Sequence, residues 1–142
     1  MNPKQIDLVQ STFELVSPNA EAVANLFYQR LFELDPSLRP LFKSDMKSQG
    51  AKLMKTLSIV VWGLNETDKL IPVVSQLGAR HVGYGVKDAH YDTVGAALLW
   101  TLGMGLGDEF TKDAEEAWTA AYTLLAGVMK AAAADVDTVT TH

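Results

Sequence analysis

The chain of 142 residues is 48% hydrophobic and 20% charged, with a formal net charge of −5 at pH 7. This length and mixture are typical of one soluble globular domain, and the acidic charge argues against general binding of nucleic acid. The sequence has no cysteine, which excludes disulfides and thiolate metal sites. It also has no run of about 18 apolar residues and no signal-peptide pattern, so we expect a cytoplasmic protein without a membrane segment.

Apolar residues three or four positions apart predict helices along the whole chain. The first helix begins at Pro3 and ends near residues 17–19 (SPN). The second ends at residues 35–36 (DP), because proline disfavours the helical conformation in the residue before it. Residues 36–42 (PSLRPLF) predict a tight turn or a single helical turn.

A third helix is predicted from about Asp45. One face of it carries Gln49, Leu53, Leu57, Val60 and Leu64. A fourth helix contains His81 and should end at Gly83 and Gly85, because glycine at such a position favours the end of a helix. Asp88 is then the expected N-cap of a fifth helix.

The last part of the chain continues this pattern. Glycines in residues 103–107 (GMGLG) punctuate the fifth helix, and Thr111 is the expected cap of the last one. Residues 134–142 have no sustained period and should fray. No strand with a period of two competes, and no linker or repeat divides the chain. The sequence therefore predicts an all-α, single domain over residues 1–142, with six to eight helices.

His81 is unexpected on its helix face. It follows Leu70, Val74 and Leu77 at spacings of four, three and four, so it lies on the side meant for the core. Taken alone, a histidine there is more often a hydrogen-bonded core residue than a metal ligand.

Three other residues are equally ordinary when taken singly. Tyr28 could be a core aromatic, Phe42 a packing anchor and Gln49 an exposed residue near a helix start. Together with His81 they form a pattern: Phe42 follows Tyr28 by fourteen residues after a proline-rich corner, and His81 follows Gln49 by thirty-two. This arrangement resembles that of a globin.

The chain resembles single-domain bacterial haemoglobins of the flavohaemoglobin-like branch over residues 4–133. The matching segments are LFYQRLFELDPSLRPLF, SQGAKLMKTL, LGARHVGYGV, AHYDTVGAALL and AWTAAYTLLAGV. The resemblance implies a globin fold enclosing haem b. It places His81 as the proximal iron ligand, whose other ring nitrogen would donate to an acceptor such as the Leu77 carbonyl, and Phe42 against the haem face.

The resemblance also implies which residues surround the haem. Those implied to line it are Leu53 and Leu57 on the distal side, and Leu77 and Val86 on the proximal side. Tyr28 and Gln49 match the distal pair that donates hydrogen bonds to bound O2. A bond to a partly charged ligand contributes roughly 1.5–3 kcal/mol, or about tenfold to a hundredfold in affinity. Slow O2 release is therefore expected, with a smaller effect on CO.

The proximal side contains a match and a departure. Tyr91 aligns with a tyrosine that helps hold the proximal histidine. Where flavohaemoglobins add a glutamate, this sequence has Ala133, and Asp135 is about 200° further around the helix. Peroxidase-like activity is therefore not expected. The chain also stops about where the reductase half of a flavohaemoglobin would begin.

Three functions follow from these features. The favoured one is reversible binding of O2, and of NO or CO, for oxygen storage, transport or scavenging. The second is a nitric oxide dioxygenase that works with a separate reductase. The third is a haem-free sensor or interaction module. The sequence leaves open whether Lys52 or His90 occupies the site without gas, and whether Trp62 or Trp100 packs internally or at a contact between subunits of a homo-oligomer.

Overall fold

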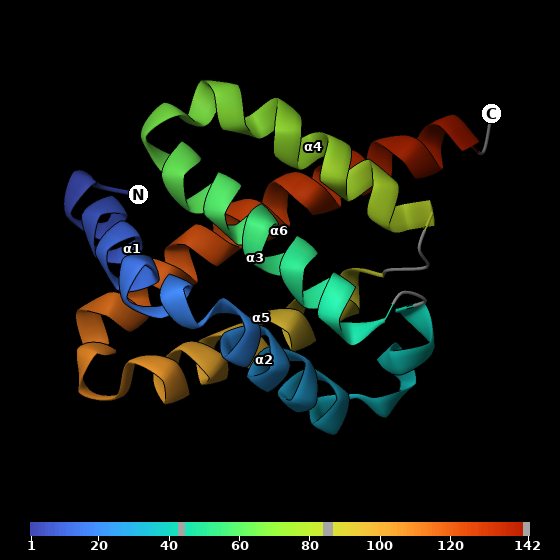
Figure 1. Ribbon diagram of the computed structural model, residues 1–142. Coiled ribbons are helices and arrows are strands. Elements are labelled where there is room, and N and C mark those ends of the chain that lie inside the picture. The colour runs from blue at the N-terminus through green and yellow to red at the C-terminus, as the bar shows by residue number, and fades with distance from the viewer. Residues whose placement is uncertain (43–44, 84–86, 141–142) are drawn as a thin grey trace.

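The computed structural model describes residues 1–42, 45–83 and 87–140, so Gly85 and Val86 lie outside the described residues. The described part is all-α, as predicted (Figure 1). Its α-helices are α1 (Pro3–Val16), α2 (Ala20–Leu34), α3 (Met46–Gly63), α4 (Thr67–Gly83), α5 (Asp88–Leu106) and α6 (Lys112–Thr140). Short 3-10 helices follow four of them: η1 (Ser17–Asn19), η2 (Pro36–Leu41), η3 (Leu64–Glu66) and η4 (Gly107–Glu109). None of the helices within the described ranges has both the length and the apolar composition needed to cross a membrane.

Most helix ends follow from local capping chemistry. The Asn2 side chain accepts a hydrogen bond of 2.8 Å from the Gln5 amide and so caps α1. α2 ends at Leu34, with Asp35 in an extended conformation directly before the first proline of η2. The Thr111 hydroxyl accepts a hydrogen bond of 3.1 Å from the Ala114 amide at the start of α6. These ends confirm the boundaries that the sequence predicts.

The start of α5 differs from the prediction. Lys87, not Asp88, is the N-cap, and its amide donates a hydrogen bond of 3.0 Å to Nδ1 of His90. The ring of His90, three residues after Lys87, thus accepts the amide of the N-cap residue, and Asp88, which we expected to be the cap, is itself the first helical residue.

Two further boundaries differ near the C-terminal half of the chain. Gly103 and Gly105 remain inside α5, and only Gly107, with φ of 55°, ends it. The buried Leu102 and Leu106 hold this turn of the helix in the core and override the weak helix propensity of glycine. α6 continues to Thr140, through most of the segment that we expected to fray.

Helices distant in sequence are held together by close contacts in the core. Trp118 of α6 donates a buried hydrogen bond of 2.8 Å to the hydroxyl of Thr12 in α1. α4 lies so close to α6 that a Cβ atom on Gly78 would be 2.5 Å from the main-chain oxygen of Met129. These contacts fix the positions of the helices that carry the candidate site.

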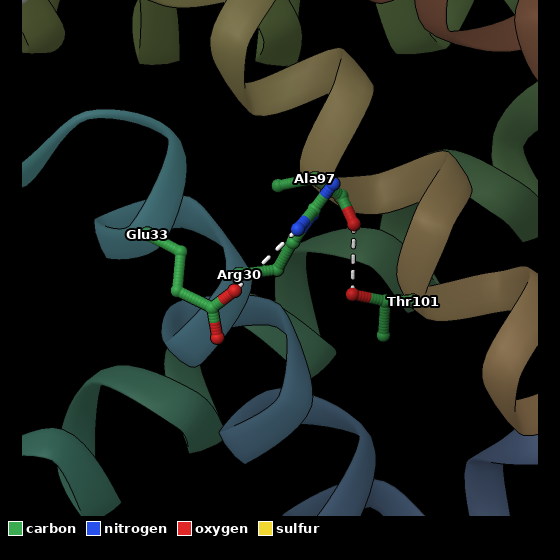
Figure 2. A network of polar contacts seen from close by, with 4 residues as sticks. All are labelled: Arg30, Glu33, Ala97 and Thr101. Carbon is green, nitrogen blue, oxygen red and sulfur yellow. Dashed lines mark hydrogen bonds and ion pairs between the residues drawn. The ribbon is translucent and has the colours of Figure 1, made fainter.

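α2 crosses α5 and packs against it (Figures 1 and 2). Arg30 of α2 lies over the ring of Trp100 at 5.2 Å and pairs with Glu33 at 3.4 Å. Thr101 faces the same interface, and its hydroxyl donates a hydrogen bond of 2.8 Å to the Ala97 carbonyl. Trp100 therefore packs within the chain, whereas Trp62 on α3 is 46% exposed.

Candidate functional site

His81 lies in the last turn of α4, on the face that the spacing predicts. Leu70 and Val74 on this face are buried, and Leu77 is partly buried against the core. Nδ1 of His81 is 2.6 Å from the Leu77 carbonyl oxygen. Because a carbonyl can only accept, the ring proton is on Nδ1 and the lone pair is on Nε2.

The surroundings of His81 favour the neutral imidazole. Burial lowers the pKa of His81, and the hydrogen bond to Leu77 opposes part of this effect. Neutral imidazole with its lone pair on Nε2 is the form that binds a metal ion. The ring is thus held in the tautomer and the charge state that an iron ligand requires.

Tyr28 is in the middle of α2 and only 7% exposed. Its hydroxyl donates a hydrogen bond of 3.3 Å to the main-chain carbonyl of Gln49 in the first turn of α3. Burial raises the pKa of Tyr28 to about 12, so the phenol keeps its proton near neutral pH. The hydroxyl has a single proton, and the Gln49 carbonyl accepts it here, so donation to a bound ligand would replace this hydrogen bond.

Gln49 approaches Tyr28 through its main chain. No side-chain hydrogen bond joins the two within the described ranges. Gly50, the next residue, allows this approach, because a Cβ atom there would be 2.9 Å from that of Ala24 on α2. The close crossing of α2 and α3 thus places the start of α3 against the Tyr28 hydroxyl.

Three phenylalanine rings surround Tyr28. The distance between ring centroids is 5.1 Å for Phe27 and 5.3 Å for Phe42, which both meet Tyr28 edge-on. It is 6.0 Å for Phe32, which is stacked on Tyr28. Phe42, directly after η2, is only partly buried. The phenol is therefore held in an apolar cluster with its hydroxyl at one edge.

The remaining predicted residues divide between core and partly exposed positions. Leu57 is buried, whereas Leu53 and Leu77 are partly buried against the core. Tyr91 is buried at the start of α5. The Tyr122 hydroxyl donates a hydrogen bond of 2.6 Å to the main-chain carbonyl of Tyr91. The proposed contact of Val86 lies outside the described residues, as does the side chain of Asp135.

Lys52 and His90, which the sequence leaves open as residues that occupy the site without gas, have other surroundings. Lys52 is exposed, and the ring of His90 accepts the Lys87 amide. Among the residues that the structure describes, no group of three His, Cys, Asp or Glu side chains could hold a metal ion. The donor set is thus one imidazole and one phenol with apolar neighbours.

This donor set fits a haem. Iron in a porphyrin needs only one or two protein ligands, and the porphyrin is bound mainly by apolar surface. His81 supplies one nitrogen ligand. The partly exposed apolar side chains of Phe42, Leu53 and Leu77 provide surface that a flat apolar group would cover.

Sequence reasoning missed the residues that set the helix spacing. Gly50 and Gly78 are needed because neighbouring helices approach them closely. The only signal in the sequence was a glycine inside a helical pattern, which indicates close approach but does not name the partner.

The all-α fold, with a histidine at the end of α4 and a buried phenol on α2, agrees with the globin class of haem proteins. The family model named Globin matches residues 25–129, and the chain belongs to the globin family. The resemblance inferred from the sequence is thereby confirmed.

Curated relatives include flavohemoproteins from two bacteria. That of Bacillus subtilis (strain 168) is 31% identical over 129 residues, which cover 89% of this chain and 32% of the relative. That of Vibrio cholerae is 30% identical over 131 residues, which cover 90% of this chain and 33% of the relative. The chain thus spans about one third of the length of these relatives and is homologous to their globin domain.

Two solved structures share the fold. An engineered carbene transferase, from a candidate nitric oxide dioxygenase of Rhodothermus marinus, superposes with a TM-score of 0.90 at 24% identity and covers 100% of this chain and 99% of its own. A globin from Campylobacter jejuni has a TM-score of 0.82 at 23% identity, covering 95% and 98%.

Proposed function

We propose that this chain binds haem b through Nε2 of His81 and reversibly binds O2, and also NO or CO, on the side of Tyr28. The observation that carries the proposal is the 2.6 Å contact between Nδ1 of His81 and the Leu77 carbonyl, because it directs the ring lone pair to the outer nitrogen. When bound, the haem would supply the ferrous iron at which a diatomic gas binds.

The residues of the chain would then distinguish one gas from another. Tyr28 would move its hydrogen bond from the Gln49 carbonyl to a ligand that carries partial negative charge, with Gln49 as a second donor or an orienting partner. Phe42 and Leu53, both partly buried against the core, would offer apolar surface beside the bound ligand. Because O2 on ferrous iron acquires more charge than CO, the phenol stabilises O2 more.

Replacing Tyr28→Phe tests the distal part of the proposal. Loss of a charge-assisted hydrogen bond worth roughly 1.5–3 kcal/mol should accelerate O2 dissociation about tenfold to a hundredfold, and CO dissociation less. Stopped-flow measurement of both rates checks this. The matched control is Tyr122→Phe, which removes a buried hydroxyl that donates to the Tyr91 carbonyl. Equal O2 dissociation rates in the native protein and the Tyr28 variant would exclude a role for the phenol.

The alternative is a nitric oxide dioxygenase, in which NO, O2 and one electron yield one nitrate ion. The buried neutral phenol of Tyr28 supports it, because its proton, if moved from the Gln49 carbonyl to the ligand, would stabilise an anionic oxygen ligand. Sustained NO consumption in the presence of a separate reductase would distinguish this enzyme from a carrier, since a single turnover of an oxygenated globin does not.

A further inference from the structure

Positive charge is concentrated in one short part of this acidic chain. Residues 36–55 contain five Lys or Arg residues and a single Asp, a net charge of +4. The whole chain carries −5, so the remainder carries −9. Such segregation creates an attractive field for a negatively charged partner at one part of the surface.

Three of these basic residues lie on the solvent-exposed side of α3. Lys47 and Lys55 are separated by eight residues and Lys52 lies between them, so all three are on the outer side of the helix. All three are exposed. Further along the same side, Ile59 is 45% exposed and Trp62 is 46% exposed. We call Lys47, Lys52, Lys55, Ile59 and Trp62 the α3 outer face.

The charges of this face are not neutralised within the chain. The described residues form two ion pairs, Arg30 with Glu33 and Lys69 with Glu66, and neither includes a residue of the α3 outer face. The one acid of this region, Asp45, accepts the Ser48 amide as N-cap of α3. The lysines therefore remain available to an external carboxylate-rich surface.

The α3 outer face is next to the candidate ligand site. Gln49 and Leu53 lie on another side of the same helix, and Lys52 adjoins them in sequence. An α-helix with its side chains is about 10–12 Å across. A protein docked at Lys52 would therefore lie about one helix width from Gln49 and Leu53.

We propose that the α3 outer face docks an acidic electron-carrier protein, with its lysines facing carboxylates of the carrier and Trp62, near the end of the helix, as the apolar anchor. The proposal rests on the proposed haem binding, because ferric iron must be reduced before it can bind O2. One electron would pass from the reduced carrier to the ferric iron. The carrier becomes oxidised, the iron becomes ferrous, and no atom is transferred.

An acidic protein fits this face better than an anionic membrane. An interfacial helix inserts a broad apolar face into lipid, but the apolar face of α3 is buried in the core through Met54, Leu57 and Val61. Only Ile59 and Trp62 remain outside. Two apolar residues beside lysines are typical of a protein interface with a small hydrophobic centre.

Binding is tested with the haem-loaded, isotope-labelled protein titrated with an oxidised, acidic plant-type ferredoxin. We expect amide signals to change along α3 and in η2. The double variant Lys47→Glu, Lys55→Glu should weaken binding at least tenfold. The matched variant Lys4→Glu, Lys112→Glu makes the same change of net charge on exposed residues elsewhere and should alter binding less than twofold. Trp62→Ala should weaken binding without changing net charge.

A second readout is reduction of the ferric protein by reduced ferredoxin in stopped flow. The rate should fall with increasing salt in the native protein and depend little on salt in the Lys47, Lys55 variant. Reduction by lumiflavin, which is uncharged and small, should be the same in all variants.

Three results would overturn the docking proposal: equal effects of the two charge-reversal pairs, binding to anionic phospholipid vesicles with no binding to ferredoxin, or dimerisation of this chain through α3. A protein without a Soret band would instead refute the proposed haem function. The ferredoxin titration of that same purified protein would still report on the surface, so the two failures are distinguishable.

Discussion

At the residue scale, main-chain carbonyls orient the two polar side chains of the candidate site. Leu77 fixes the tautomer of His81, and Gln49 accepts the Tyr28 hydroxyl. The first contact is local, four residues along one helix, and could be anticipated from the sequence. The second depends on the crossing of α2 and α3, so the sequence indicated the pair but not that the main chain of Gln49 makes the contact.

The ionisation of Tyr28 has a consequence for stability. Burial raises its pKa from 10.0 to about 12, so the folded chain holds this proton more tightly than the unfolded chain. The resulting stabilisation is complete below pH 10 and is lost as the pH rises toward 12. We therefore expect the free energy of unfolding, measured by urea titration, to fall over this range less steeply in Tyr28→Phe. An identical slope in both proteins would contradict the assignment.

The buried hydrogen bond between Trp118 and Thr12 should be needed for stability. Thr12→Val keeps the shape but leaves the indole N–H without an acceptor, at a cost of about 1–3 kcal/mol. Thr119→Val removes an exposed hydroxyl that bonds to its own helix and should change stability by at most about 0.5 kcal/mol. Denaturant unfolding followed by tryptophan fluorescence measures both. Similar losses of stability in the two variants would show that the buried hydrogen bond contributes no more than the exposed one.

At the element scale, helix ends with strong local signals were predictable and those set by packing were not. The start at Asn2 and the stop before Pro36 depend on caps and on proline. The glycines at 103 and 105 resembled a break, yet buried neighbours keep them helical. Asp88 resembled an N-cap, but Lys87 is the N-cap and its amide is accepted by the ring of His90.

The spacing of α4 and α6 gives an element-scale prediction. Gly78→Ala would bring a Cβ atom within 2.5 Å of the Met129 main chain, and overpacking against backbone should destabilise the fold by about 1–3 kcal/mol. Because α4 carries His81, affinity for haem should also fall. Gly127→Ala on α6 has nothing within 4 Å and should stabilise by about 0.5–1 kcal/mol through helix propensity.

Thermal unfolding and haemin titration of the two glycine variants separate these effects. Equal changes of stability in Gly78→Ala and Gly127→Ala would mean that α4 and α6 do not approach as closely as described.

At the scale of the whole molecule, the all-α fold was predictable from the apolar periodicity of most helices, and the globin fold from the resemblance of the site residues and their spacing to the globin family. The distribution of charge over the folded surface was not. The basic stretch is visible in the sequence, but its exposure along α3 beside Trp62 depends on which face of that helix the core buries.

The most direct test of the central claim is titration of the purified protein with haemin, followed at the Soret band, in the native chain and in His81→Ala. We expect the native chain to take up one haem, to show the spectrum of a histidine-ligated iron, and to unfold at a higher temperature when loaded, because a ligand that binds only the folded state stabilises it. His81→Ala should lose that spectrum. A native chain that gives no Soret band, or a spectrum unchanged by the substitution, would contradict the account.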